Sequence, residues 1–439
     1  MKMRENRGLR RWAAACAAGA MLLASAGCGI NGEDKNLLPG RKESEQVVNM
    51  FSPMEKTDPN AENVARTASD LTIAMAEERL GVTVAYQTYT AEDYQDKTYD
   101  EVALDRARND MDDLYLLNPD TILTLGAEGR LMDLSGLDSA KNLREIVRVA
   151  NTVDGKLVAI PQEVVAYGLF VNVDMFRQYG LELPNTPEEF LECCRVFQEN
   201  GVDTPVGANR WWLETFVLAQ AYADLYNGGN TEAEIAALNS GEARYSDYMR
   251  PGFEFLQELI DCGYIDAEKA LVSEAIEAER PDFLAGRTPI VMAYWGAANT
   301  DTAYGDTDFE MQVIGFPSSR GQMPVIPMTG FAVGAGAEHA EDAMRVLDVV
   351  TSDEALQLYS ETNRVISPSK NVSVACVPAL RPLNDRIEEG VYVLGSNAGM
   401  NVEQWGNTCL IVRQLLGGGT VDECMAAFDR LQDAAANRR

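Results

Sequence analysis

The sequence predicts an α/β protein made of two lobes. Short β-rich runs alternate with helical segments along the first third of the chain, which is the pattern of parallel strands joined by crossover helices. The chain has 439 residues, of which 46% are apolar. This length exceeds the roughly 250–300 residues at which a single hydrophobic core stops growing, so two lobes are expected.

The first 27 residues have the composition of an export signal. Five basic residues and one acid lie within Met1–Arg11, and the apolar run Trp12–Ala26 is shorter than the roughly 20 residues that cross a bilayer as a helix. Small residues then precede Cys28 in a segment that resembles the lipobox of bacterial lipoproteins, which implies signal removal and acylation of the Cys28 thiol. Ser25 stands where that motif has an aliphatic residue, so ordinary cleavage near Ala26 stays open.

The segment that follows predicts a flexible tether. Residues 28–45 are rich in Gly, Asn, Glu, Asp, Lys and Ser and contain a Pro39-Gly40 turn, so the folded part is expected to begin near Gln46. A lipid-anchored chain of this kind is expected on the outer face of the cell membrane, or in the periplasm of a bacterium with two membranes.

The charge balance excludes nucleic acid as a partner. The chain has 37 Lys and Arg against 68 Asp and Glu, a net charge of −31, and without residues 1–27 the balance is 32 against 67, or −35. A nucleic-acid-binding surface must present basic side chains that displace the counterions of phosphate groups, whereas this surface repels phosphate. An anionic membrane surface would repel the protein too, but a covalent lipid needs no basic patch.

The expected elements of the first lobe follow one another closely. We expect strands at 46–51, 81–86 and 113–117, and helices at 61–80, at 98–109 and from Pro119 to Gly129. Two more strands are expected at Lys156–Pro161 and from Gly168, before a clear helix start. Thr186 can cap that helix, Pro187 suits its first position, and Glu189 completes a capping box.

These motifs resemble those of the extracellular solute-binding proteins of bacterial ABC importers. The run Gly168–Phe176 and the helix start after it are similar to the opening of the second lobe in the carbohydrate-binding, maltodextrin-binding-protein-like branch. Phe283–Gly296, Gly315–Pro317 and Thr329–Gly334 resemble later motifs of the family in the same order. The resemblance covers about residues 45–435, and the conserved order of short motifs carries it.

The resemblance implies a periplasmic-binding-protein-like fold, with two α/β lobes, a ligand cleft between them and three hinge crossovers. Lobe 1 is expected at 46–160 and 330–373, lobe 2 at 161–329 and 374–439, and the crossovers at Pro161–Val165, Thr329–Val333 and Ser373–Val377. The implied function is that of a monomeric receptor, which closes on a sugar or oligosaccharide and delivers it to permease subunits in the membrane.

Aromatic side chains are the expected contacts to such a solute. The apolar face of a sugar ring stacks on Trp or Tyr, while its hydroxyl groups bond to carboxylates and amides at the rim. Outside the signal, every tryptophan falls on a segment that the resemblance assigns to the cleft. We therefore expect ligand contacts from Trp211, Trp212, Trp295 and Trp405, together with Tyr294 and Phe331. The alternative for each ring is a place in the core.

Polar contacts are expected at the ends of strands and near the crossovers. Glu55 follows the first strand, and Asn118 and Asp120 follow the third, where the carboxyl ends of parallel strands border a crevice. Glu163 lies beside the first crossover, and Arg364 follows the helix that is expected after residue 352. The alternative for each of these side chains is a solvated place on the surface.

The sequence predicts a binding protein and not an enzyme. His339 is the only histidine, so the chain has no Ser-His-Asp or Cys-His arrangement and no His-rich metal site, and we expect neither a metal nor a cofactor. A secreted glycoside hydrolase stays open, because it needs only two carboxylates. A binding protein for a peptide, an amino-acid derivative or a polyamine stays open as well.

Overall fold

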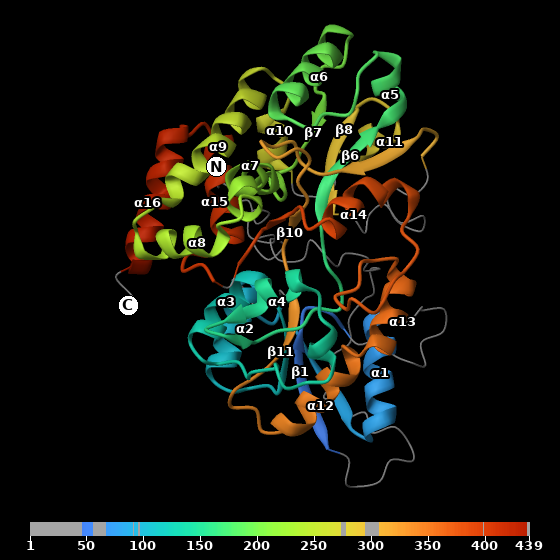
Figure 1. Ribbon diagram of the computed structural model, residues 1–439, viewed down its shortest axis with the longest axis vertical. Helices are drawn as coiled ribbons and strands as arrows, with labels where there is room; N and C mark the ends of the chain where they lie inside the picture. Colours follow the sequence, from blue (N-terminus) through green and yellow to red (C-terminus); the bar gives the residue numbers. More distant parts are fainter. Residues whose placement is uncertain are drawn as a thin grey trace, which may run out of the picture.

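The computed structural model describes residues 46–55, 67–90, 92–94, 97–273, 278–294, 307–397 and 399–436. Over these ranges the chain forms two α/β bodies, which Figure 1 shows one above the other with extended segments between them. The lower body, here called lobe 1, contains the N-terminal strands, and the upper body, lobe 2, contains the C-terminal helices. The predicted signal, the predicted tether and Cys28 lie outside the described residues.

Within the described residues, lobe 1 is built on a four-stranded sheet in the order β11-β3-β1-β2. Its strands are β1 (Val47–Ser52), β2 (Thr83–Thr88), β3 (Leu114–Leu117) and β11 (Gly330–Val333). As predicted, β1, β2 and β3 run parallel, with β2 and β3 on either side of β1. β11 runs antiparallel to β3, since the chain returns to it from lobe 2 and not through a crossover helix.

Side chains along each strand of this sheet point alternately to its two faces, and helices pack against both faces. In β3, Leu114 and Leu116 pack in the same cluster as Ile73 of α1, whereas Tyr115 packs with Val102 of α2. Helices α1, α12 and α13 pack together on the first side, and α2 and α3 pack together on the second. The remaining elements of lobe 1 are α1 (Ala68–Leu80), α2 (Tyr99–Arg108), α3 (Pro119–Ala127), α4 (Glu145–Asn151), β4 (Thr152–Val153), β5 (Lys156–Leu157), α12 (Ala340–Val350) and α13 (Asp353–Asn363).

Lobe 2 is built on a mixed sheet in the order β12-β10-β6-β8-β7, with β9 also paired to β6. Its strands are β6 (Tyr167–Asn172), β7 (Val206–Gly207), β8 (Ile290–Tyr294), β9 (Met311–Ile314), β10 (Val325–Ile326) and β12 (Val393–Leu394). β6 runs antiparallel to β8, β9 and β10. Every residue of β6 is buried, so this strand forms the centre of the sheet.

The helices of lobe 2 pack around α7 (Leu213–Asn227). This helix is buried on almost every side, as its nearly continuous apolar sequence requires, and α9 and α15 contact it directly. The other helices are α5 (Val173–Gln178), α6 (Pro187–Glu199), α8 (Thr231–Ser240), α9 (Tyr245–Asp261), α10 (Ala267–Val272), α11 (Arg280–Leu284), α14 (Arg381–Glu388), α15 (Trp405–Leu416) and α16 (Val421–Ala436).

The extended segments that join the lobes lie side by side. Ile160 and Phe331 exchange two backbone hydrogen bonds of 2.9 Å, and the Val164 N–H donates to the Ile366 carbonyl at 2.9 Å. The strand predicted at Lys156–Pro161 is shorter than expected, because only its first two residues form a ladder, with β4, and the rest belongs to the connection. Two lobes joined by a few extended residues have the geometry of a hinge.

Capping boxes start two of the helices, and the one at α6 confirms the prediction for Thr186 and Glu189. At α6, Thr186 Oγ1 accepts the Glu189 N–H at 3.2 Å, and the Glu189 carboxylate accepts the Thr186 N–H at 3.3 Å. At α16, Thr420 and Glu423 form the same reciprocal pair. Each pair satisfies backbone donors that the first turn of a helix leaves without a partner.

A substitution at a glycine of β6 can test how β6 and β9 pair in the sheet of lobe 2. A Cβ at Gly168 would lie 2.5 Å from the Ile314 carbonyl oxygen of β9. Gly168→Ala should therefore lower the free energy of unfolding by about 1–3 kcal/mol, measured by urea denaturation. The control is Gly136→Ala, since a Cβ at Gly136 meets no atom within 4 Å. Equal stability of the two variants would contradict the pairing of β6 with β9.

Candidate functional site

Aromatic side chains cluster where β6 begins, directly after the chain crosses into lobe 2. The centroid of the Tyr167 ring lies 6.0 Å from that of Trp212 and 5.4 Å from that of Trp405. Tyr167 also pairs with Tyr294 of β8 across the sheet. Tyr167 and Trp212 are 3% and 2% exposed, whereas Trp405 and Tyr294 are only partly buried. In this aromatic cluster (Tyr167, Trp212, Tyr294 and Trp405), Trp405 and Tyr294 are therefore the rings that keep part of their surface exposed.

Trp211 has a different environment. Two guanidinium groups lie over its ring, with the Cζ atoms of Arg210 and Arg413 each 4.7 Å from the ring centroid. The side chain is 5% exposed. Because cation–π contacts occupy the stacking surface of this ring, the structure favours the core alternative for Trp211, and burial favours it for Trp212.

Glu163 lies at the crossover between the lobes. The preceding residue is tied to lobe 1, since Gln162 Nε2 donates to Thr72 Oγ1 at 2.8 Å. The Tyr359 hydroxyl donates to Glu163 Oε1 at 3.4 Å, a long hydrogen bond. Burial of the carboxyl group raises the pKa of Glu163 to about 7. Burial also raises the pKa of Tyr167, and the charge of Glu214 adds to that effect more than the charge of Glu163 does. Along the chain, Glu163 precedes Tyr167 of the aromatic cluster by four residues.

Asn118 and Asp120 follow β3 but bond to different partners. Asn118 Nδ2 donates to a carboxylate of α2 within lobe 1, at 3.0 Å. Asp120 instead reaches lobe 2, where the Ser396 hydroxyl donates to Oδ1 at 2.9 Å and the Gly406 N–H donates to Oδ2 at 2.8 Å. Burial, and after it the charge of Glu403, raises the pKa of Asp120 to about 7.

The other candidates differ in their surroundings. Phe331 is buried within β11, and Glu55 is exposed after β1. Arg364 is exposed at the end of α13 and has a positive φ of 53°. Trp295 lies outside the described residues. Direct contact of these residues with a ligand stays a prediction.

Sequence reasoning missed three residues of this region: Tyr167, Tyr359 and Ser396. Tyr167 directly precedes the strand that the sequence predicts from Gly168, so a strand start one residue earlier would have found it. Tyr359 and Ser396 carry no local signal, because their partners Glu163 and Asp120 are 196 and 276 residues away along the chain.

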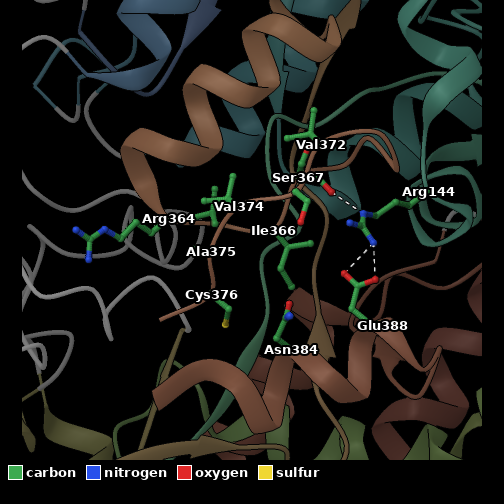
Figure 2. Close-up of a pocket in the computed structure, with 12 residues that line it drawn as sticks. Arg144, Arg364, Ile366, Ser367, Val372, Val374, Ala375, Cys376, Asn384 and Glu388 are labelled. Atoms are coloured by element: carbon green, nitrogen blue, oxygen red, sulfur yellow. Dashed lines mark hydrogen bonds and ion pairs between the residues drawn. The ribbon is translucent and has the colours of Figure 1, made fainter. Parts of the chain in front are cut away.

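A pocket lies at the connecting segments and is lined by residues of both lobes (Figure 2). Arg144 of lobe 1 donates through Nη1 to both carboxylate oxygens of Glu388 in lobe 2 at 2.9 Å, and its Nε donates to the Ser367 carbonyl at 2.8 Å. Figure 2 shows Arg364 pointing away from this ion pair. The pocket measures about 70 Å³, which is room for roughly five water molecules and too little for an oligosaccharide.

Some kinds of site are not seen in the described part of the chain. Its His, Cys, Asp and Glu side chains form no group of three or more that could hold a metal ion. None of the helices in the described ranges is long and apolar enough to span a membrane. The six cysteines that the structure describes have free thiols, including the adjacent Cys193 and Cys194.

Solved structures share this fold. A family 1 extracellular solute-binding protein from Bifidobacterium longum subsp. infantis has 17% sequence identity and a TM-score of 0.68, over 89% of this chain and 99% of that chain. The sugar-binding protein MalE from Xanthomonas citri has 13% identity and a TM-score of 0.64, over 90% and 98%. The solute-binding protein RafE in complex with raffinose has 16% identity and a TM-score of 0.62, over 89% and 99%. No curated protein matches the chain in sequence.

The structural similarities confirm the predicted periplasmic-binding-protein-like fold with two α/β lobes. At these identities they show the fold alone. The sequence gives the family independently, because the model of the bacterial extracellular solute-binding proteins matches residues 64–357, more than half of the chain. The chain therefore belongs to the family of bacterial extracellular solute-binding proteins.

Proposed function

We propose that this protein is the extracellular receptor of an ABC importer and that it binds a sugar or oligosaccharide between its two lobes. The observation that carries the proposal is the aromatic cluster at the start of β6, where the chain enters lobe 2 four residues after Glu163. The partly buried rings of Trp405 and Tyr294 offer apolar faces to the C–H groups of a sugar. MalE, a sugar-binding protein, and RafE, in complex with raffinose, have the same fold and support a carbohydrate ligand.

Glu163 supplies the polar contact in this proposal. With a pKa of about 7, its carboxyl group is present in both protonation states near neutral pH, so it can donate to or accept from a sugar hydroxyl. Its bond to Tyr359 is long at 3.4 Å, so a hydroxyl at a shorter distance would form the stronger bond.

The lobes close because the solute can contact both of them at once only in the closed form. A solute that touches both lobes shifts the population towards the closed form by the difference between its affinities for the two forms. The permease then recognises the closed form and accepts the solute unchanged. For the lobes themselves we propose the limits 46–160 with 330–373, and 161–329 with 374–439.

Trp405 provides the test of the site. Trp405→Ala should weaken carbohydrate binding by about thirtyfold, or about 2 kcal/mol, because the stacking face is lost. The probe is the mono- or oligosaccharide that raises the melting temperature most in a thermal-shift screen of the wild type. Isothermal titration calorimetry then measures its affinity for the wild type and the variant.

The matched control is Trp211→Ala. This change should cost about 3–5 kcal/mol of stability, since the ring is buried, and should leave the affinity of the folded protein unchanged. Undiminished affinity of Trp405→Ala, or a screen in which no carbohydrate raises the melting temperature, would contradict the proposal. Shorter products after incubation with an oligosaccharide would favour a glycoside hydrolase instead.

We propose further that acylated Cys28 anchors the mature chain in the membrane. Cys28→Ser should move the protein from the membrane fraction to the medium or periplasm without changing its melting temperature, because the tether precedes the folded part. Cell fractionation with immunodetection measures this. The control is Cys262→Ser, which removes an exposed thiol of lobe 2 and should stay with the membrane. A Cys28→Ser variant that remains in the membrane fraction would refute lipid anchoring.

A further inference from the structure

We infer that Asp120 is a positioning residue, which ties lobe 1 to the start of α15 and thereby sets the place of Trp405. Asp120 lies in the first turn of α3, in lobe 1. Both of its carboxyl oxygens accept hydrogen bonds from lobe 2, from the Ser396 hydroxyl at 2.9 Å and from the Gly406 N–H at 2.8 Å. The inference rests on the proposed function only in that Trp405 is the proposed sugar contact.

A second contact extends this tie along α3. Thr124 follows Asp120 by one turn and lies on the same face of the helix. Its hydroxyl donates to Glu403 Oε1 at 2.6 Å. Asp120 and Thr124 of lobe 1, with Ser396, Glu403 and Gly406 of lobe 2, therefore form one interlobe latch.

The latch holds the backbone on two sides of Trp405. Gly406 follows Trp405 directly, and Ser396 follows Gly395, whose backbone supports the Trp405 ring. A Cβ at Gly395 would lie 2.6 Å from Cε3 of that ring, so only glycine permits the contact. If Asp120 moves relative to lobe 2, its bonds to Ser396 and Gly406 pull on the backbone on both sides of the Trp405 ring.

The latch also responds to pH. The charged groups that act on Asp120 are Glu403 of lobe 2 and Asp100 of α2, both acids, while the bonds from Ser396 and Gly406 favour its carboxylate form. Burial and the charge of Glu403 outweigh those bonds and raise the pKa of Asp120 from 3.8 to about 7 when the lobes are in contact. Separation of the lobes exposes the carboxyl group and removes Glu403, so the pKa falls towards its ordinary value.

Whether contact between the lobes strengthens or weakens with pH follows from the number of protons that each form binds. Between about pH 4 and pH 7 the latched form binds more protons than the separated form. Contact between the lobes is therefore most favoured below about pH 4 and is lost progressively as the pH rises through about 7. At high pH the two carboxylates of Asp120 and Glu403 repel each other across the lobes.

The experiment is small-angle X-ray scattering of the solute-free protein at about pH 5 and about pH 8, where Asp120 of the latched form changes its protonation. The wild type should have the smaller radius of gyration at the lower pH. Asp120→Asn keeps an acceptor for Gly406 and a donor for Ser396 without charge, so it should be compact at both pH values. Asp120→Ala loses both bonds and should be expanded at both.

The matched control is Asp133→Asn, because this exposed carboxylate of lobe 1 bonds to Ser135 of the same lobe. It should respond to pH like the wild type. A wild type without a pH response, an Asp120→Asn variant with the full response, or an Asp120→Ala variant as compact as the wild type at the lower pH would each overturn the inference. No carbohydrate is present, so these outcomes are independent of whether the protein binds sugar.

Discussion

Two backbone hydrogen bonds between Ile160 and Phe331 join the first two connections between the lobes, and the behaviour of the whole molecule depends on this pair. Both residues are almost fully buried, so water does not compete for the bonds. The Val164 N–H donates a single hydrogen bond to the Ile366 carbonyl and adds the next segment. The connections therefore form one narrow strip, which is the geometry of a hinge.

The lobes also touch on both sides of this strip. Figure 1 shows α3 and α15 on one side of the connections and α14 on the other. On the first side the contacts are the bonds of Asp120 and Thr124, and on the second the Arg144–Glu388 ion pair. Each of the hydrogen bonds on the first side contributes a net stabilisation of about 0.5–1.5 kcal/mol, and the partly exposed ion pair contributes about 0–1 kcal/mol. A solute can open or close such contacts only by as much as its affinities for the two forms differ.

Local features of this protein could be predicted from its sequence, and long-range ones could not. The capping box at Thr186 was predictable because both partners lie within four residues. The parallel strands of lobe 1 were predictable because buried runs alternate with helices. Trp211 was assigned to the ligand from its sequence context, whereas the structure places the guanidinium group of distant Arg413 over its ring. Asp120 was predicted to bind the ligand, and its bonds to lobe 2 depend on packing that no local pattern encodes.

Closure of the lobes on a carbohydrate can be measured by small-angle X-ray scattering at one fixed pH, with and without a saturating amount of the tightest-binding sugar. The radius of gyration should be smaller with the sugar, because rotation about the connections brings the lobes together. A radius of gyration that stays the same at saturation would contradict closure.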